Sequence, residues 1–254
     1  MKNIINKGIL PLAGSLLVLA ACTKNIQDET PRESDPGVYA SVQVYNAAIG
    51  TKGNFIYMDG VPLNGAPFVY TQTTSTNAAY TGSGLIFGLA PGTHTFTVRD
   101  TAVATTQAPL VFSNSMQPNT SYTIFTYDTL TAVKQLTVQN SFPTVQDTTA
   151  RVRFAHLAFL KSGNPGNVDI FSKNRNANLF SNVAFKAVSD YVAFQSRKSD
   201  TLIVRNAGTQ TGLDTAFFNP AAKRYYTLVF RGRFSTNEAG GALYPRTLAS
   251  FVNY

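Results

Sequence analysis

The fold is decided by a stretch that occurs twice in the chain: ASVQVYNAA at residues 40–48 and ARVRFAHLA at residues 150–158. In both copies apolar and polar side chains alternate with a period of two, which is the pattern of a β-strand with one buried face. Similar runs rich in Val, Ile, Phe, Tyr and Thr follow, separated by clusters of Gly, Pro, Asn and Asp. No window of helical length has a 3.6-residue apolar stripe. The sequence therefore predicts an all-β chain of antiparallel sandwiches.

Four further segments of the first half recur in the second half in the same order. Residues 54–60 correspond to 167–171, 92–99 to 199–205, 118–125 to 221–229, and 135–140 to 247–253. A repeat of about 105 residues is too long for a solenoid unit and suits one sandwich domain. We therefore predict two tandem β-sandwich domains at residues 38–147 and 148–254, joined near residues 142–149, where Pro143 and polar residues interrupt the pattern.

Segments of the second copy at residues 150–156, 168–171, 188–191 and 225–227 also carry a family resemblance. Together they resemble the family called domain of unknown function 4397. The first copy keeps the turn Met58-Asp59-Gly60 but has Asn46 where the second has His156. Residues 157–162 depart from the Ser-Pro-rich turn of that family. The resemblance implies an immunoglobulin-like sandwich in a secreted or lipid-anchored bacterial protein, and it implies no activity.

The N-terminal residues have the features of a lipoprotein signal. Lys2 and Lys7 accompany an apolar run at residues 9–19, which is too short to span a bilayer, since a spanning helix needs about 20 apolar residues. The run ends in Leu19-Ala20-Ala21-Cys22, which resembles the lipobox of bacterial lipoproteins. We expect residues 1–21 to be removed and Cys22 to be lipidated. The alternative is a buried thiol behind an ordinary cleavable signal.

A multiply acylated Cys22 would tether the protein to a membrane without crossing it. Residues 22–37 are polar and contain two prolines, so they predict a flexible tether. Because Cys22 is the single cysteine, no disulfide can form within the chain. The expected location is the outer membrane of a Gram-negative cell envelope, at the cell surface. Asp28-Glu29 weakly resembles a surface-export signal, although a solvated linker explains it more simply.

Catalytic and metal-binding motifs are missing from the sequence. His94 and His156 share strand parity with apolar neighbours, so we interpret both as structural and expect no metal site. Asp59 and Asp169 recur between the copies beside turn residues, where aspartate is common. There is no nucleophile elbow, phosphate-binding glycine loop or calcium loop. We expect a protein without cofactors that is not an enzyme.

Charge distinguishes the two halves of the chain. Residues 38–149 carry three Lys or Arg and four Asp, whereas residues 150–254 carry fourteen Lys or Arg and five acidic residues. Alternation with apolar residues predicts that four arginines point outward as a patch for an anionic glycan or another acidic surface: Arg151, Arg153, Arg231 and Arg233. The alternative is a basic face that serves solubility. Nucleic acid is a poor partner for an exported lipoprotein.

Sugar binding and glycosylation give two further expectations. The chain has no tryptophan and its period-two pattern places many Tyr and Phe in the cores, so the loop from Tyr70 to Tyr80 is the best candidate for a ligand-facing segment. Five of the ten aspartates precede threonine. These Asp-Thr pairs resemble bacterial O-glycosylation sites, or they are turn-to-strand junctions; their threonines are Thr101, Thr129, Thr148, Thr201 and Thr215.

The leading interpretation is a non-catalytic, lipid-anchored cell-envelope protein that acts as a surface binding or adhesion module. The second is a structural envelope component that faces the periplasm and binds another protein through a sheet edge or the basic face. A hydrolase with an unrecognised site is a third interpretation.

Overall fold

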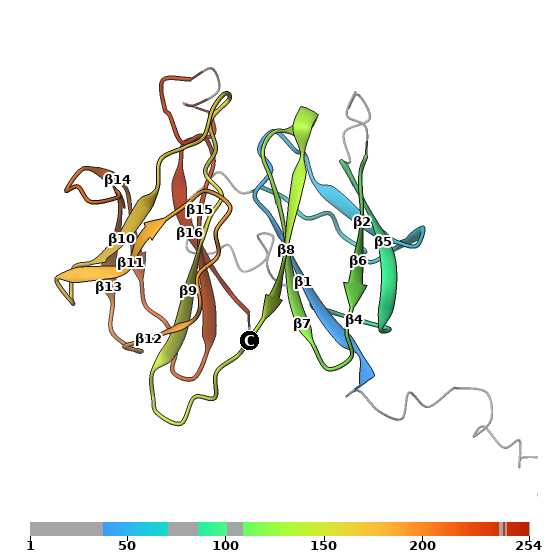
Figure 1. Ribbon diagram of the computed structural model, residues 1–254, viewed down its shortest axis with the longest axis horizontal. Coiled ribbons are helices and arrows are strands. Elements are labelled where there is room, and N and C mark those ends of the chain that lie inside the picture. The colour runs from blue at the N-terminus through green and yellow to red at the C-terminus, as the bar shows by residue number, and fades with distance from the viewer. Residues whose placement is uncertain (1–37, 71–85, 101–108, 239–240, 242, 254) are drawn as a thin grey trace, which may run out of the picture. The chain divides into compact units, whose positions relative to one another are not determined.

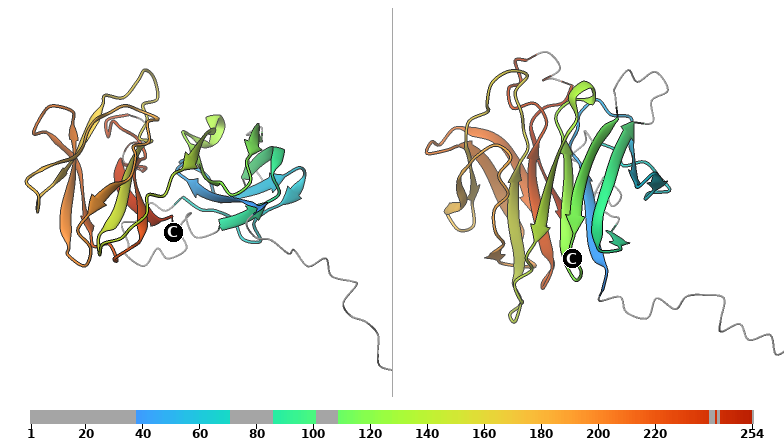
Figure 2. Two further views of the ribbon diagram at one scale, coloured as in Figure 1. Left: turned by 60° about the horizontal axis from the view of Figure 1, so that its bottom comes forward. Right: turned by 45° about the vertical axis from the view of Figure 1, so that its right-hand side comes forward.

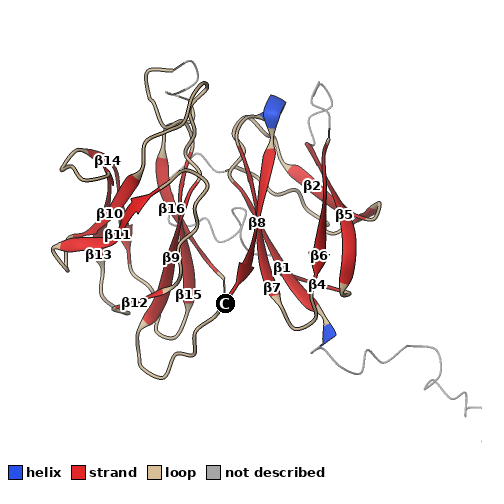
Figure 3. Cartoon of the chain, in the orientation of Figure 1, coloured by secondary structure: helices blue, strands red, loops and turns tan. Residues whose placement is uncertain are grey.

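The computed structural model of the chain describes residues 38–70, 86–100, 109–238, 241 and 243–253. Its named elements are β-strands and a short 3-10 helix, η2 (Leu130–Ala132), and a single 3-10 residue, Val38, precedes the first strand (Figure 3). The expected signal peptide at residues 1–21, the tether at 22–37 with Cys22, loop residues 71–80, and Thr101 lie outside the described residues. No helix within the described ranges is long and apolar enough to cross a membrane.

The first half of the chain forms two four-stranded sheets that face each other (Figure 1). The order of one sheet is β4-β1-β7-β8, and the order of the other is β3-β2-β5-β6. We call this pair of sheets the first sandwich. Its strands are β1 (Ala40–Asn46), β2 (Asn54–Met58), β3 (Val61–Pro62), β4 (Ile86–Leu89), β5 (Gly92–Asp100), β6 (Leu110–Met116), β7 (Ser121–Tyr127) and β8 (Lys134–Asn140).

The second half repeats this arrangement strand by strand. Its sheets have the orders β12-β9-β15-β16 and β11-β10-β13-β14, which are the first-half orders with eight added to each number. The two sheets of this second sandwich also lie face to face (Figure 2). Its strands are β9 (Ala150–His156), β10 (Val168–Ser172), β11 (Ala177–Val183), β12 (Val192–Phe194), β13 (Asp200–Asn206), β14 (Gly212–Phe218), β15 (Tyr225–Arg231) and β16 (Thr247–Val252).

The predicted fold class is confirmed: the described chain is all-β and forms two β-sandwiches. Each sandwich departs from a purely antiparallel arrangement at one strand pair. β1 runs parallel to β7, with Ser41 beside Ser121, and β9 runs parallel to β15, with Arg151 beside Tyr225. The chain visits the opposite sheet between the two members of each pair, and this crossover lets it return in the same direction.

Each sandwich has its own apolar core between its sheets. Ile56, Phe96 and Ile124 lie in the core of the first sandwich. Phe154 and Leu202 lie in the core of the second. Phe96 and Val98 of β5, and Leu202 and Val204 of β13, are alternate residues of their strands, as a half-buried strand requires.

A third apolar cluster joins the two sandwiches within the compact unit Gly37–Tyr254. Tyr45 and Phe125 from the first sandwich pack against Val229 and Phe251 from the second. Tyr45 stacks on Phe251 with 4.7 Å between ring centroids. The sheets that contain β1 and β9 are therefore covered on both faces, and burial along β1, β7, β9 and β15 is almost continuous.

Candidate ligand-binding site

A polar pocket of about 410 Å³ lies at one end of the second sandwich. It is lined by Thr148, Thr149, Arg175 and residues 193–196. These come from the segment before β9, the turn between β10 and β11, and the end of β12 with the loop that follows it. Hydroxyl, amide and guanidinium groups therefore line one pocket, although they come from separate parts of the sequence.

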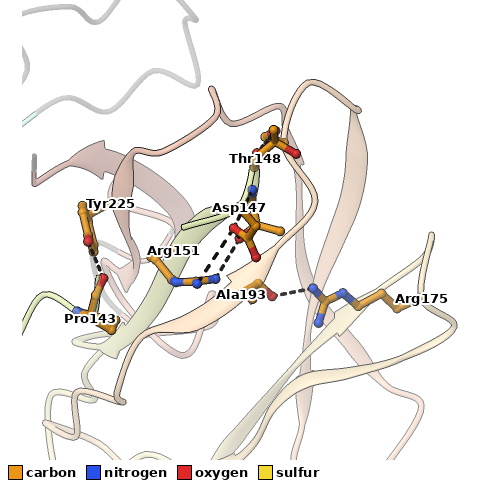
Figure 4. Close-up of polar contacts among 9 residues, drawn as sticks. Pro143, Asp147, Thr148, Arg151, Arg175, Ala193 and Tyr225 are labelled. Atoms are coloured by element: carbon orange, nitrogen blue, oxygen red, sulfur yellow. Dashed lines mark hydrogen bonds and ion pairs between the residues drawn. The ribbon is translucent and has the colours of Figure 1, made fainter. Parts of the chain in front are cut away.

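Arg175 is held across this pocket by two contacts. Its Nη2 donates a 2.6 Å hydrogen bond to the carbonyl oxygen of Ala193, and its guanidinium carbon lies 5.2 Å from the centroid of the Phe194 ring. Figure 4 shows the side chain extended toward Ala193. Arg175 is nevertheless exposed. A guanidinium has five N–H donors, so this arrangement leaves several donors for a ligand.

The turn that carries Arg175 is fixed by a buried carboxylate. Asp200 is 3% exposed and accepts a 2.5 Å hydrogen bond from Ser172 Oγ and a 3.0 Å bond from the backbone N–H of Asn174. Asn174 Nδ2 donates to the carbonyl of Ser199 at 2.8 Å. The backbone under Arg175 is thus preorganised, and the charge of Asp200 is directed into the turn rather than toward the pocket.

The opposite wall of the pocket is fixed by Asp147. Its Oδ1 accepts 2.6 Å and 3.0 Å hydrogen bonds from the hydroxyl and backbone N–H of Thr149, which together hold the pKa of Asp147 below its usual value. Arg151 donates to the Thr149 hydroxyl at 2.7 Å and lies 3.9 Å from Asp147 Oδ1. Ser196 Oγ donates a 2.5 Å bond to the carbonyl of Thr148. Arg151 offsets the negative charge of Asp147 at this wall.

Exposed cations surround the pocket. Backbone contacts bring their turns together: Arg197 N–H donates to the Pro220 carbonyl at 2.8 Å, and Lys223 N–H donates to the Thr149 carbonyl at 2.9 Å. The turns after β10 and β14 share one end of the sandwich because both strands run antiparallel to β13, and the loop after β12 reaches the same end because it leads into Asp200, which pairs with Phe218 at the end of β14. We call the six exposed cations of these turns the basic end: Lys173, Arg175, Arg197, Lys198, Lys223 and Arg224.

The four arginines predicted to form an outward-facing patch do not do so. Arg153, Arg231 and Arg233 are 2%, 6% and 9% exposed, and the Arg151 side chain is 14% exposed. The prediction was wrong because it assumed that the outer faces of these strands meet solvent. The outer face of the sheet that contains β9 and β15 is instead covered by the first sandwich.

Each buried arginine has a packed environment. The Arg153 guanidinium lies 4.9 Å from the centroid of the Tyr191 ring, and burial lowers its pKa. Arg231 lies 4.4 Å from the ring centroid of Tyr70, the residue that begins the predicted ligand-facing loop. Arg233 lies 4.8 Å from the Phe159 ring centroid and 3.8 Å from a Glu238 carboxylate oxygen. These contacts give the three arginines structural roles.

Sequence reasoning identified the basic half of the chain but missed the cations that are exposed. A signal was present, because the segments SKNRN at 172–176, SRK at 196–198 and AKR at 222–224 are polar turn sequences that each hold two cations. They follow alternate strands, and turns after alternate strands of a sandwich share one end. The strand arginines on which the prediction rested are buried, whereas the cations of the turns are exposed.

His94 and Asp59 form a pair that the sequence analysis treated as separate residues. His94 Nδ1 lies 2.6 Å from Asp59 Oδ2, and Nε2 lies 2.8 Å from the Ala90 carbonyl oxygen. Both ring nitrogens face acceptors, and the hydrogen bonds with Asp59 and then with the Ala90 carbonyl raise the pKa of His94, so they favour the form that donates from both nitrogens. The hydrogen bond with His94 lowers the pKa of Asp59. A doubly donating imidazole has no lone pair with which to act as a base.

His156 is buried, as predicted from its strand parity. It is 0% exposed, its Nε2 lies 3.2 Å from the Gly166 carbonyl oxygen, and Phe185, Phe230 and Phe234 surround its ring. Burial lowers its pKa to about 4, so the ring is neutral near pH 7. The described residues contain no group of three His, Cys, Asp or Glu side chains that could hold a metal ion.

The structure describes four of the five threonines that follow aspartate. Thr148 and Thr215 are exposed, and Thr129 and Thr201 are half-buried. Asp128, Asp147 and Asp200 lie at or near strand ends, as the junction interpretation requires, whereas Asp214 lies inside β14. Glycosylation of these threonines stays a prediction.

Residues 40–163 match the model of the family described as "Domain of unknown function (DUF4397)". The match covers the first sandwich and extends through β9, so the other second-half segments that carried the predicted resemblance lie beyond it. A search of curated proteins found no match.

Similar solved structures include two of streptococcal origin and one from Eubacterium rectale. The first is titled as alpha-glucan recognition by family 41 carbohydrate-binding modules from streptococcal virulence factors (8% identity, TM-score 0.23, 75% of this chain and 92% of that chain). The second is the family 26 module of Eubacterium rectale Amy13K with maltoheptaose (11%, 0.25, 84% and 95%). The third concerns alpha-glucan binding by a streptococcal virulence factor (9%, 0.22, 75% and 92%). Scores this low carry no argument about the ligand of this chain.

Proposed function

We propose that the protein is a non-catalytic binding module of a bacterial cell envelope, anchored through a lipid on Cys22, and that its basic end binds an anionic ligand. The lipobox-like Leu19-Ala20-Ala21-Cys22 supports the anchor. The observation that carries the binding proposal is the grouping of six exposed cations around one polar pocket.

The charge of this end is not offset by neighbouring carboxylates. Asp200 is buried and accepts hydrogen bonds from its own turn, and Asp147 is paired with Arg151 and Thr149. Like charges placed together on a surface repel each other and raise the local positive potential. A ligand with several negative groups relieves that repulsion, and this gain is larger at low ionic strength because salt screens exposed charges.

The pocket supplies specific contacts as well as charge. Arg175 offers a planar set of donors that suits a carboxylate, sulfate or phosphate group. Thr148, Thr149 and Ser196 contribute hydroxyls, and Gln195 contributes an amide. The turn beneath Arg175 is already hydrogen-bonded, so little conformational entropy is lost when the ligand binds.

Charge reversal at the basic end tests this proposal. The test variant combines Arg175→Glu, Arg197→Glu and Lys223→Glu. The control variant combines Lys52→Glu, Lys161→Glu and Lys186→Glu. Both change the net charge equally, and all six positions are exposed. Binding of the detergent-purified full chain to heparin, alginate and polyglutamate would be measured at several salt concentrations. We expect the first variant to bind at least roughly tenfold more weakly than the control. Equal losses in both variants would reduce the effect to net charge and overturn the proposal.

A further inference from the structure

One aromatic side chain lies on the surface beside the basic end. Phe217 in β14 is 85% exposed. β14 is an edge strand of its sheet, and Phe217 is its penultimate residue, directly before the buried Phe218 and the loop that carries Lys223 and Arg224. Phe217 is therefore not among the many Tyr and Phe side chains that were expected to lie in the cores.

Phe217 belongs to a row of side chains on the outer face of its sheet. It pairs with Thr201, and at the next outward position Thr215 pairs with Ile203. Ile203 in turn pairs with Phe171 of β10. Because successive strand residues alternate between faces, these five side chains share the face opposite the core.

This row meets the basic end at the strand termini. The backbone N–H of Lys173 donates to the carbonyl of Thr201 at 3.1 Å, and Thr201 is the strand partner of Phe217. Arg197 N–H donates to the carbonyl of Pro220, three residues after Phe217. The exposed ring and the cations therefore lie along one continuous edge of the second sandwich.

The fold does not require an aromatic residue at this position. The corresponding penultimate residue of β6 in the first sandwich is Ser115, which is also exposed. An exposed phenyl ring forgoes the burial that normally stabilises phenylalanine in a fold by about 1.5–3 kcal/mol. The aromatic ring and the clustered cations occur in the same sandwich, and the first sandwich has neither at its equivalent turns.

We infer that Phe217 is a stacking surface for a sugar ring, so that the ligand of the basic end is an acidic polysaccharide. This inference rests on the proposed function and narrows it from an anionic ligand to one class. The C–H face of a pyranose packs on an aromatic ring. The hydroxyls of Thr201 and Thr215, which lie beside Phe217, can then hydrogen-bond to the hydroxyl groups of the sugar. An acidic polysaccharide presents charges for the cations and rings for Phe217 along one chain.

The same surface favours a polysaccharide over other polyanions. An acidic polypeptide offers charge but few rings that stack on an isolated phenyl group. Single-stranded nucleic acid is held on platforms where successive bases stack on several aromatic side chains. Among the described residues Phe217 is the one highly exposed aromatic ring; threonines accompany it, and the nearby pocket is lined by hydroxyl, amide and guanidinium groups.

The test compares Phe217→Ala and Phe217→Tyr with the unaltered full chain, and Ser115→Ala is the control at the equivalent position of the first sandwich. Affinity would be measured for alginate, heparin, polyglutamate and oligo-dT across a salt series. We expect Phe217→Ala to weaken alginate or heparin binding about 5- to 20-fold with an unchanged salt slope, and to leave polyglutamate binding unchanged. Phe217→Tyr and Ser115→Ala should bind like the unaltered chain.

Several outcomes would overturn the inference without affecting the proposed function. One is that Phe217→Ala binds the polysaccharides with the same affinity as the unaltered chain. Another is that Phe217→Ala loses as much affinity for polyglutamate as for the polysaccharides. A third is that the unaltered chain binds polyglutamate but neither polysaccharide. A loss confined to oligo-dT would identify a nucleic-acid surface instead. If the unaltered chain binds none of the four polymers, the proposed function fails together with the inference.

Discussion

Arg153 and Thr123 belong to different sandwiches, and Arg153 Nη2 donates a 3.0 Å hydrogen bond to Thr123 Oγ1. Arg153 Nε also donates at 2.8 Å to Thr227, which occupies in β15 the place that Thr123 has in β7. Each threonine hydroxyl donates to an asparagine of its own sandwich, Thr123 to Asn140 at 3.1 Å and Thr227 to Asn253 at 2.5 Å. The two sandwiches thus meet through equivalent faces, with the Arg153 guanidinium between the two threonines.

We expect Arg153→Ala to destabilise the protein by about 2–4 kcal/mol, because it leaves a cavity and removes the donors to two buried hydroxyls. Arg153→Met retains most of the side-chain volume and should lose less. Arg197→Ala, at an exposed position, should change stability by no more than about 0.5 kcal/mol. Urea unfolding of the three variants measures these differences. A loss below 0.5 kcal/mol in Arg153→Ala would show that the buried guanidinium contributes nothing to the union of the sandwiches.

The burial of Arg153 shows which features of a strand the alternating pattern can predict and which it cannot. Alternation with Val152 and Phe154 correctly placed those two in the core of the second sandwich. The alternation could not show that the other face of β9 is also covered, because that face is buried by residues of the first sandwich such as Tyr45 and Phe125. The repeated strand order, in contrast, was recoverable because each strand is encoded by its own local pattern.

The candidate site was only partly predictable for a similar reason. The excess of cations in residues 150–254 is visible in the sequence, but the three turns that display them are brought together by backbone contacts such as Lys223 to Thr149. His94 and Asp59 are 35 positions apart, and their pairing depends on the register between β2 and β5. Phe217 follows the alternation of β14, yet the pattern does not reveal which face of an edge strand is solvated.

Because His156 is buried and neutral, the free energy of unfolding should decrease as the pH falls. Its pKa is about 4 in the folded protein and about 6.5 when unfolded, so the unfolded chain binds more protons between these values. Stability should therefore fall by about 3 kcal/mol as the pH decreases from 6.5 to 4 and then level off. His156→Gln should remove this slope, whatever its effect at pH 7. Urea midpoints measured from pH 7 to pH 4 compare the two proteins, and parallel curves would contradict the neutral assignment.

The pair formed by half-buried His94 and exposed Asp59 should instead make stability decrease as the pH rises. The folded pKa of His94 is raised, so its contribution to stability is complete below about pH 6.5 and is lost as the pH rises through the folded value. His156→Gln is the proper background, because the chain contains two histidines and that variant leaves only His94 to titrate in this range. Adding His94→Gln should remove the remaining decline in stability between pH 6 and pH 9. A decline that persists in the double variant would assign it to other groups.

The proposed lipid anchor requires the Cys22 thiol. In cells that produce the full chain, Cys22→Ala should abolish incorporation of labelled fatty acid and release the protein from the membrane fraction. Lys24→Ala, two residues later, should behave like the unaltered protein and serves as the control. If Cys22→Ala stays membrane-bound and labelled, the anchor lies elsewhere and Leu19-Ala20-Ala21-Cys22 is not a lipobox.

We propose that the protein is anchored to the outer membrane, and the membrane face that carries it decides which polymers its basic end can meet. A protease added to intact cells reaches surface proteins and leaves periplasmic ones uncut, so a known periplasmic protein must stay intact in the same sample. We expect the sandwiches to be lost from intact cells through cleavage in residues 22–37, a segment with six charged side chains that precede Gly37 and almost no apolar ones beyond Ile26. External polysaccharides would then be the relevant polymers for the Phe217 test. Complete protection of the chain would contradict a surface location and favour the periplasm-facing alternative, in which the basic end meets acidic polymers or proteins of the envelope itself.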